Sequence, residues 1–196
     1  MKKKTVALLL ALVLVVGVVA GGTMAWLLDK TDSITNTFTT SDVDINLTET
    51  ATEFQMVPGA TISKDPKVTV TDTSESCYVF VELTKSENFD TFMTYTVADG
   101  WTQGTGSSEG GNGVPTNVYY RTVNATDTTR TFSVLSGDTV SVKSDVTKTQ
   151  LNAVATNGQP TLTVTAYACQ LAKTSTENFT VGDAWTQVKG FNAGNE

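Results

Sequence analysis

The chain has few side chains that could carry out acid–base, nucleophilic or metal chemistry. It contains no histidine among its 196 residues. Histidine is the side chain that most often carries protons near neutral pH, and it is also a common metal ligand. Without it, neither Ser-His-Asp and Cys-His nucleophilic sites nor an HExxH zinc site can be built. A serine or threonine without a base is not a nucleophile, so the sequence predicts no enzyme, no catalytic residue and no cofactor.

Two cysteines, Cys77 and Cys169, are the remaining reactive groups. In an exported chain such a pair is consistent with one disulfide. Both lie in apolar, strand-like stretches, however, where a buried free thiol is equally ordinary. Both interpretations stay open at this point.

The carboxylates are scattered over turns and strand faces. Asp42, Asp44 and Glu49 could together hold a cation, calcium rather than catalytic zinc. Solvated charges on a strand face explain them more simply, so no metal site is predicted. The glycine-rich residues 103–116 lack the lysine and the following helix of a phosphate-binding loop. We expect them to form a flexible connection between two strands.

The N-terminus has the organisation of an export signal. Residues 2–4 are lysines, residues 6–20 are uniformly apolar, and small residues follow up to Ala25. This order predicts a signal peptide over residues 1–25, cleaved between Ala25 and Trp26. An uncleaved helix over residues 6–28 is the alternative, because it is long enough to cross a bilayer.

The charge of the exported part limits its partners. The leader holds three of the 13 basic residues and none of the 20 acidic ones, so the rest has 10 basic and 20 acidic residues. A net charge of about −10 repels nucleic acid and anionic membranes. The tail has no sorting motif, hydrophobic anchor or lipidation signal.

Beyond the leader, β-branched residues alternate with polar ones, which is typical of strands. Helical spacing is weak and limited to residues 86–92 and 144–155. Residues 131–135 and 139–143 predict the clearest hairpin, joined at residues 136–138. The other expected strands are residues 42–48, 67–71, 76–84, 118–122 and 161–172; residues 76–84 have apolar side chains on both faces and are expected to be central.

These strands predict an all-β fold, an antiparallel two-sheet β-sandwich of the jelly-roll kind after an N-terminal signal helix. An immunoglobulin-like sandwich is the alternative, but the wide spacing of the two cysteines fits it poorly. The expected organisation is a signal peptide (1–25), an N-terminal extended segment (26–40) and a β-sandwich domain (41–196).

Several stretches resemble one family of exported bacterial proteins. Residues 21–38 (GGTMAWLLDKTDSITNTF) and the DVDINLTE that follows at 42–49 are similar to the export signal and first strands of proteins processed by the signal peptidase SipW. That family includes TasA and the camelysin (CalY) proteins. Residues 58–83 (PGATISKDPKVTVTDTSESCYVFVEL), Trp101, the Tyr119–Tyr120 pair and residues 164–170 (VTAYACQ) resemble its later parts.

The resemblance implies a Gram-positive, SipW-processed protein of the cell surface or extracellular matrix. It would form biofilm-matrix or surface fibres as a homo-oligomer, with a minor anchoring subunit as a further candidate partner. In TasA-like fibres, the N-terminal segment of each mature subunit enters its neighbour as a missing strand. The side chains that would fill the neighbour's groove are Trp26, Leu27, Leu28, Ile34 and Phe38.

Physical reasoning supports strand donation, because an extended apolar segment gains backbone hydrogen bonds and apolar cover when it joins a sheet edge. The alternative is that Ile34 and Phe38 fold back onto their own sandwich. For function, the first hypothesis is a fibre subunit and the second is a monomeric surface adhesin or binding module. A camelysin-like peptidase is the third, and the lack of histidine argues against it.

Overall fold

The computed structural model describes residues 43–50, 55–107 and 109–193. The chain divides into two compact units, Met1–Thr39 and Thr40–Glu196, and every described residue belongs to the second. In this unit strands predominate, and each ladder between them is antiparallel. The expected all-β class is therefore confirmed.

The largest sheet, called the large sheet below, has four strands in the order β10-β4-β7-β6. β4 and β10 are its longest strands and pair along nine residues each. The expected central position of β4 is confirmed, because it has β10 on one side and β7 on the other. The strands are β4 (Cys77–Lys85), β6 (Thr102–Gln103), β7 (Val118–Val123) and β10 (Leu162–Gln170).

Two smaller sheets complete the strand structure. The first, the β3 sheet, has the order β1-β3-β8, with β1 (Ile45–Thr48), β3 (Lys67–Val70) and β8 (Thr131–Ser133). The second, the β9 sheet, has the order β2-β9-β5, with β2 (Thr61–Ser63), β9 (Thr139–Val142) and β5 (Met93–Thr94).

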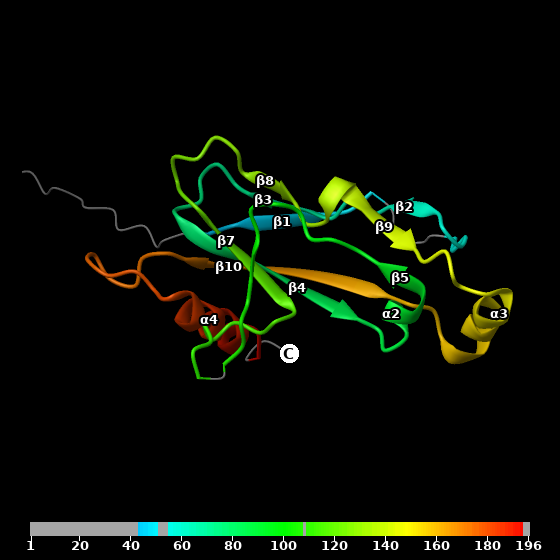
Figure 1. The fold of residues 1–196 in the computed structure, drawn as a ribbon. Helices are drawn as coiled ribbons and strands as arrows, with labels where there is room; N and C mark the ends of the chain where they lie inside the picture. Colours follow the sequence, from blue (N-terminus) through cyan, green and yellow to red (C-terminus); the bar gives the residue numbers. More distant parts are fainter. Residues whose placement is uncertain (1–42, 51–54, 108, 194–196) are drawn as a thin grey trace, which may run out of the picture. The chain divides into compact units, whose positions relative to one another are not determined.

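One apolar cluster, the main core, joins the three sheets. Alternate residues of β4, including Val79 and Val81, meet Val68 and Val70 of β3 and Val140 of β9, and all five are at most 1% exposed. The large sheet thus lies on one side of the main core and the two smaller sheets on the other (Figure 1). Period-two alternation in short strands explains how so many valines reach one interior.

A second apolar cluster, the outer core, covers the opposite face of the large sheet. Phe80 of β4 contacts Trp185 there, with ring centres 5.3 Å apart. Trp185 belongs to α4 (Val181–Ala193), which lies against this sheet (Figure 1). β4 is therefore apolar on both faces because each face has its own cover. The other buried members of the outer core are Val114, Val118, Ala184 and Val188.

The predicted hairpin over residues 131–143 is wrong. β8 pairs with β3, whereas β9 pairs with β2 and β5, so the two strands belong to different sheets. Between them the short helix η1 (Ser136–Asp138) contains Gly137 and Asp138 at positive φ. This bend redirects the chain instead of folding it back on itself.

Three α-helices are found among the described residues. α2 (Phe89–Phe92) lies within the first stretch of weak helical spacing, and α3 (Lys148–Asn157) overlaps the second and ends two residues beyond it. α3 begins with a capping box, in which Thr147 and Gln150 satisfy each other's backbone N–H groups. α4 was not predicted, although its apolar residues follow helical spacing.

The glycine-rich connection is more ordered than expected. The Gly106 N–H donates to the Val114 carbonyl (2.7 Å), and the Asn112 side chain accepts hydrogen bonds from the N–H groups of Thr105 and Val114. Val114 is fully buried in the outer core. The connection therefore packs against the large sheet, as the helix α4 does.

Candidate functional site

All the residues predicted to direct export and assembly lie outside the described residues. These are the cleavage pair Ala25 and Trp26 and the assembly residues Trp26, Leu27, Leu28, Ile34 and Phe38. Asp42, one of the three candidate cation ligands, lies outside them too. The candidate site therefore consists of surfaces formed by the described residues.

The two cysteines are free thiols and form no disulfide. They lie on neighbouring strands, but Cys169 is opposite Tyr78 and Gln170 is opposite Cys77. This single step in register directs Cys77 into the main core and Cys169 toward the outer core. A disulfide needs side chains that point toward one another, so the disulfide alternative is wrong and the free-thiol alternative holds. Burial raises the pKa of Cys77 to about 11 and also raises the pKa of Cys169.

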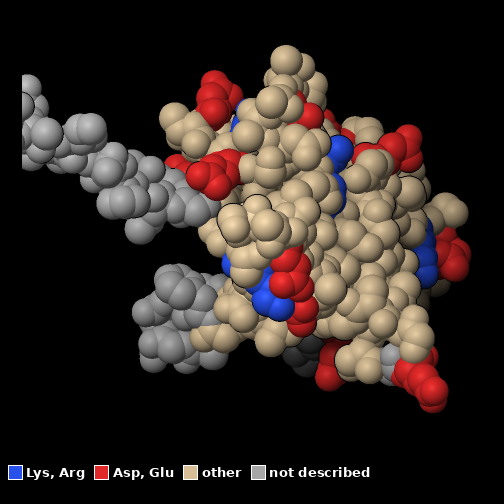
Figure 2. All heavy atoms as spheres, turned by 90° about the vertical axis from the view of Figure 1, so that its left-hand side faces the viewer, with Lys and Arg blue, Asp and Glu red and all other residues tan. Residues whose placement is uncertain are grey.

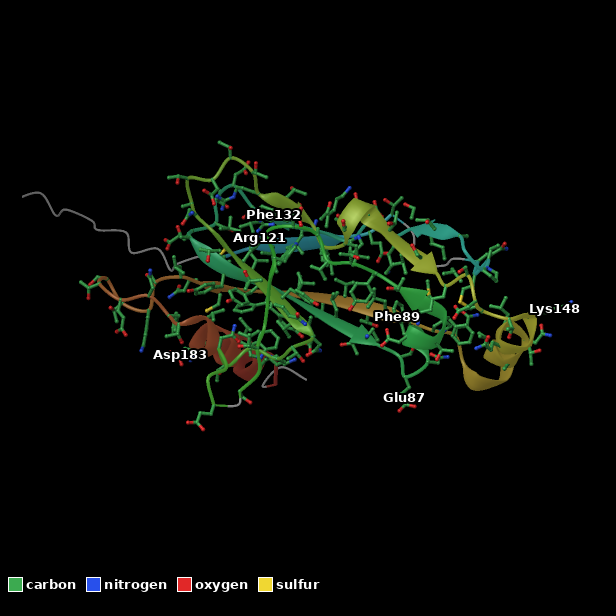
Figure 3. All side chains as sticks on the ribbon, viewed as in Figure 1. Glu87, Phe89, Arg121, Phe132, Lys148 and Asp183 are labelled. Carbon is green, nitrogen blue, oxygen red and sulfur yellow. The ribbon has the colours of Figure 1, made fainter. Side chains whose placement is uncertain are left out.

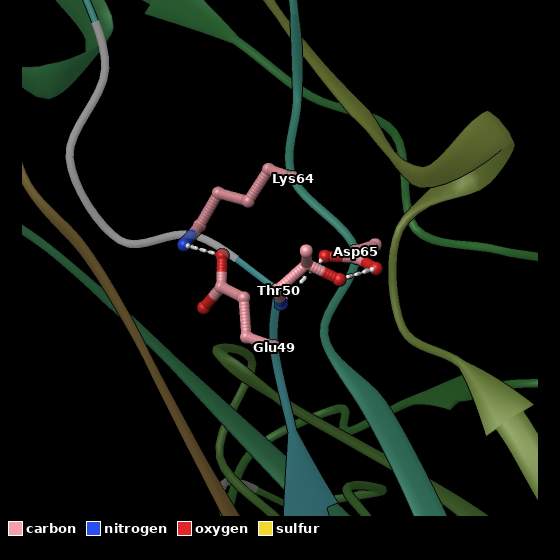
Figure 4. A network of polar contacts seen from close by, with 4 residues as sticks. All are labelled: Glu49, Thr50, Lys64 and Asp65. Atoms are coloured by element: carbon pink, nitrogen blue, oxygen red, sulfur yellow. Dashed lines mark hydrogen bonds and ion pairs between the residues drawn. The ribbon is translucent and has the colours of Figure 1, made fainter.

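Of the two remaining candidate cation ligands, Glu49 has its carboxylate engaged by another side chain. Glu49 accepts a hydrogen bond from Lys64 at 2.6 Å (Figure 4). The Asp44 backbone bonds to Ser74, whose hydroxyl accepts from the Asp44 N–H at 2.9 Å. No group of three potential ligands occurs anywhere in the described ranges.

A polar clip holds the end of β1 to the segment between β2 and β3. Thr50 donates its N–H and its hydroxyl to the two carboxylate oxygens of Asp65, at 2.9 Å and 2.6 Å, beside the Lys64–Glu49 pair (Figure 4). These hydrogen bonds from Thr50 are the main reason that the pKa of Asp65 is lowered. The clip fixes the position of β1 at the margin of the β3 sheet.

Six of the described strands end a sheet: β1 and β8, β10 and β6, and β2 and β5. Among these six, β1 ends the β3 sheet and β10 ends the large sheet. The two strands contact one another, but no ladder joins them. Their unpaired edges therefore lie on the same side of the main core.

The hydrogen bonds between strands show which residues of β1 and β10 have backbone N–H and carbonyl groups that point toward the free edge. The Ser86 N–H donates to the Thr161 carbonyl at 3.0 Å, continuing the β4–β10 ladder. Bonded and non-bonded residues alternate in an antiparallel pair. The backbone groups of Val164 and Ala166 therefore point away from β4. On β1, the Thr71 N–H donates to the Asp44 carbonyl, so Asp44 is a bonded residue of the β1–β3 pair. The next residue, Ile45, is therefore non-bonded, and its backbone groups point away from β3.

The apolar side chains of these edge strands are incompletely covered. Ile45, Leu47, Val164 and Ala166 pack on the main core but are only partly buried, whereas their ladder partners on β3 and β4 are at most 2% exposed. The main core is thus only partly covered at these two edge strands, where the backbone is also unpaired. The arrangement can accept an extended apolar segment, which would supply both hydrogen bonds and apolar contacts.

A second surface feature is a hollow of about 530 Å³ beside β7 and β8. Arg121 of β7 lies in it, with its guanidinium carbon 3.7 Å from the centre of the Phe132 ring and 5.3 Å from that of Trp101 (Figure 3). From the sequence, Arg121 was expected only to be part of a strand. It shares one strand face with Tyr119 and Val123, which both face the main core. A charged residue on an apolar strand face is the sequence signal that could have identified this position.

Charges on the face drawn in Figure 2 occur in small groups. Each basic side chain in that view lies near acidic ones, and neutral side chains make up most of the surface. This distribution forms no continuous basic surface on that face, of the kind that nucleic-acid binding requires.

Comparisons with known protein families, curated proteins and solved structures give no match to this chain. Among the described helices, none combines the length and the apolar character needed to cross a membrane.

Proposed function

We propose that the chain is an exported structural protein, a subunit of an extracellular biofilm-matrix or surface fibre assembled by strand exchange. One observation carries the proposal: β1 and β10 combine unpaired backbone edges with partly exposed, core-facing apolar side chains. The sequence resemblance to the TasA and camelysin proteins supports it as well. In this proposal, SipW removes residues 1–25, and the segment from Trp26 to Phe38 leaves its own subunit and joins the next.

We further propose that the sheets form a jelly roll. The pairs β2·β9, β3·β8 and β4·β7 are nested, each inside the one before along the chain. A long antiparallel hairpin rolled into two layers produces such nesting, which supports a jelly roll over an immunoglobulin-like sandwich.

The physical basis for exchange is that an unpaired edge with exposed apolar side chains favours strand addition. A donated strand would bond to the outward N–H and carbonyl groups of Ala166 and Ile45. Trp26, Leu27 and Leu28 would add apolar area, each buried side chain contributing about 1.5–3 kcal/mol. Entry between β1 and β10 requires these two strands to separate.

The test is electron microscopy of the purified, signal-cleaved protein. We expect filaments from the parent chain and none after deletion of residues 26–38. Ala166→Pro should also prevent filaments, because proline removes an N–H that points at the free edge while keeping the bonds to β4. Thr163→Ala is the matched control, since Thr163 is exposed on the same strand and its backbone faces β4.

Two results would count against the proposal. One is a stable monomer whose residues 26–38 are protected from hydrogen exchange at micromolar concentration, as the fold-back alternative requires. The other is normal filament formation by a folded Ala166→Pro protein. Either would favour the monomeric adhesin or binding module.

A further inference from the structure

Arg121 occupies a position where the fold elsewhere places apolar side chains. It lies opposite Val79 in the β4–β7 ladder, on the β7 face that also carries the fully buried Val123. Burial lowers the pKa of the Arg121 guanidinium, but arginine remains charged in proteins. A cation at the margin of the main core is costly unless acceptors compensate for its lost hydration.

Within the described residues, Arg121 has stacking partners but no acceptor. It forms no hydrogen bond or ion pair there, and its Nε is buried without a partner. Two other cations with buried or aromatic surroundings do have acceptors. The Nε of Arg130 is also buried without a partner, but its two terminal nitrogens donate to the Ser74 carbonyl and to two further carbonyls. Lys189, which also lies over aromatic rings, pairs with Glu82 at 3.2 Å.

We propose that the hollow around Arg121 binds the carboxylate of an acidic saccharide, such as a uronic acid residue. A guanidinium forms its strongest hydrogen bonds, two in parallel, with planar oxyanions such as carboxylates. Phe132 and Trp101 lie beside the guanidinium, 3.7 and 5.3 Å from its carbon to the ring centres, and so restrict where its donors can point. The volume of about 530 Å³ lies in the range of small-molecule sites.

The lining of the hollow indicates the rest of the ligand. Residues with hydroxyl groups and carboxylates line the hollow together with Arg121, and such groups are the partners that sugar hydroxyls use. These residues are Asp99, Thr122, Asp127, Thr128, Thr129, Thr131 and Ser133. Asp99 and Asp127 also limit the charge that the site accepts, since two carboxylates beside one arginine repel a densely charged polyanion such as polyphosphate or a sulfated glycan.

The test is a titration of the signal-cleaved protein with trigalacturonate, followed by isothermal calorimetry and by the NMR signal of the Arg121 Nε–H. Galactotriose and sodium acetate are the comparison probes. We expect saturable binding of trigalacturonate only, with a shift of the Arg121 signal. Arg121→Gln should weaken binding by roughly tenfold or more, the effect of losing a charged hydrogen bond.

Lys189→Gln is the matched control, and it should retain full affinity, because Lys189 also lies over aromatic rings but has its own carboxylate partner. Melting temperatures of both variants establish that they are folded. Equal affinity for galactotriose or for acetate would overturn the proposal, as would unchanged affinity in a folded Arg121→Gln protein. Loss of filaments in Arg121→Gln without any saccharide binding would overturn it too, and would assign Arg121 to a contact between subunits. The proposal does not depend on fibre formation, since binding is measured on dispersed protein.

Discussion

Cys77 and Cys169 lie on adjacent strands, one register step apart, and point to opposite faces of the same sheet. Cys77 is fully buried in the main core, while Cys169 is only partly buried. The two cysteines, for which the sequence alone left a disulfide open, thus belong to two separate apolar clusters. This relationship leads to the first prediction.

We predict that both thiols react with Ellman's reagent in denaturant, with or without prior reduction. In the native protein Cys77 should react much more slowly than Cys169, because it has no exposed surface. Its folded pKa of about 11 lies above the ordinary value of 9.0. The unfolded chain therefore loses this proton first, and the free energy of unfolding should fall as pH rises between these two values. A thiol count that increases on reduction would contradict the prediction.

The second prediction concerns the approach of α4 to the glycine-rich connection. A Cβ on Gly182 would lie 2.6 Å from the Asn112 carbonyl oxygen, a backbone atom. We expect Gly182→Ala to lower the melting temperature despite alanine's higher helix propensity. Gly190→Ala in the same helix meets no atom within 4 Å and should stabilise by about 1 kcal/mol. Equal stabilisation by both variants would show that the connection moves aside without cost.

The third prediction tests the outer core. Trp185 packs on Phe80 and on Tyr167, with ring centres 5.3 and 5.4 Å away. Trp185→Ala should reduce the free energy of unfolding by about 3–5 kcal/mol, measured by urea denaturation. The exposed neighbour Gln187 provides the control, because Gln187→Ala removes no packing. A loss below about 1 kcal/mol in Trp185→Ala would mean that α4 adds little to the fold.

The fourth prediction concerns the polar clip at the end of β1. The hydrogen bonds from Thr50 lower the pKa of Asp65 below its ordinary value of 3.8. Their stabilising effect is complete above that value and is lost as pH falls through the lowered pKa. Carboxyl NMR titration should show this low pKa in the parent chain and a higher one in Thr50→Val, which keeps the backbone bond but not the hydroxyl. An identical pKa in both proteins would show that the hydroxyl bond does not form in solution.

Strand positions followed from the sequence wherever alternation was strong. β4, with Tyr78 and Phe80 on one face and valines on the other, was predicted as central and apolar on both sides, and its pairing bears this out. The partner of a strand was harder to predict. β8 and β9 carry the pattern of a hairpin, but a local turn signal does not specify which distant edge each strand will join.

The helix α4 and the position of Arg121 were missed for different reasons. Val181, Ala184, Trp185 and Val188 have helical spacing, but two glycines and a polar tail weaken that signal. Arg121 interrupts an apolar strand face, and its position there is supported by Phe132 from β8 and by Trp101. Both the helix α4 and the position of Arg121 depend on contacts between segments that are distant in the sequence, and such contacts leave no local pattern.

The pairing of β4 with β10 also limits when the large sheet can fold. Lys85 finds its partner at Leu162, far along the chain, so the central strand has both neighbours only after β10 has been synthesised. Long sequence separation of this kind slows folding. The ladders of β3 with β1 and of β4 with β7 need only earlier residues, whereas the large sheet closes only when β10 arrives.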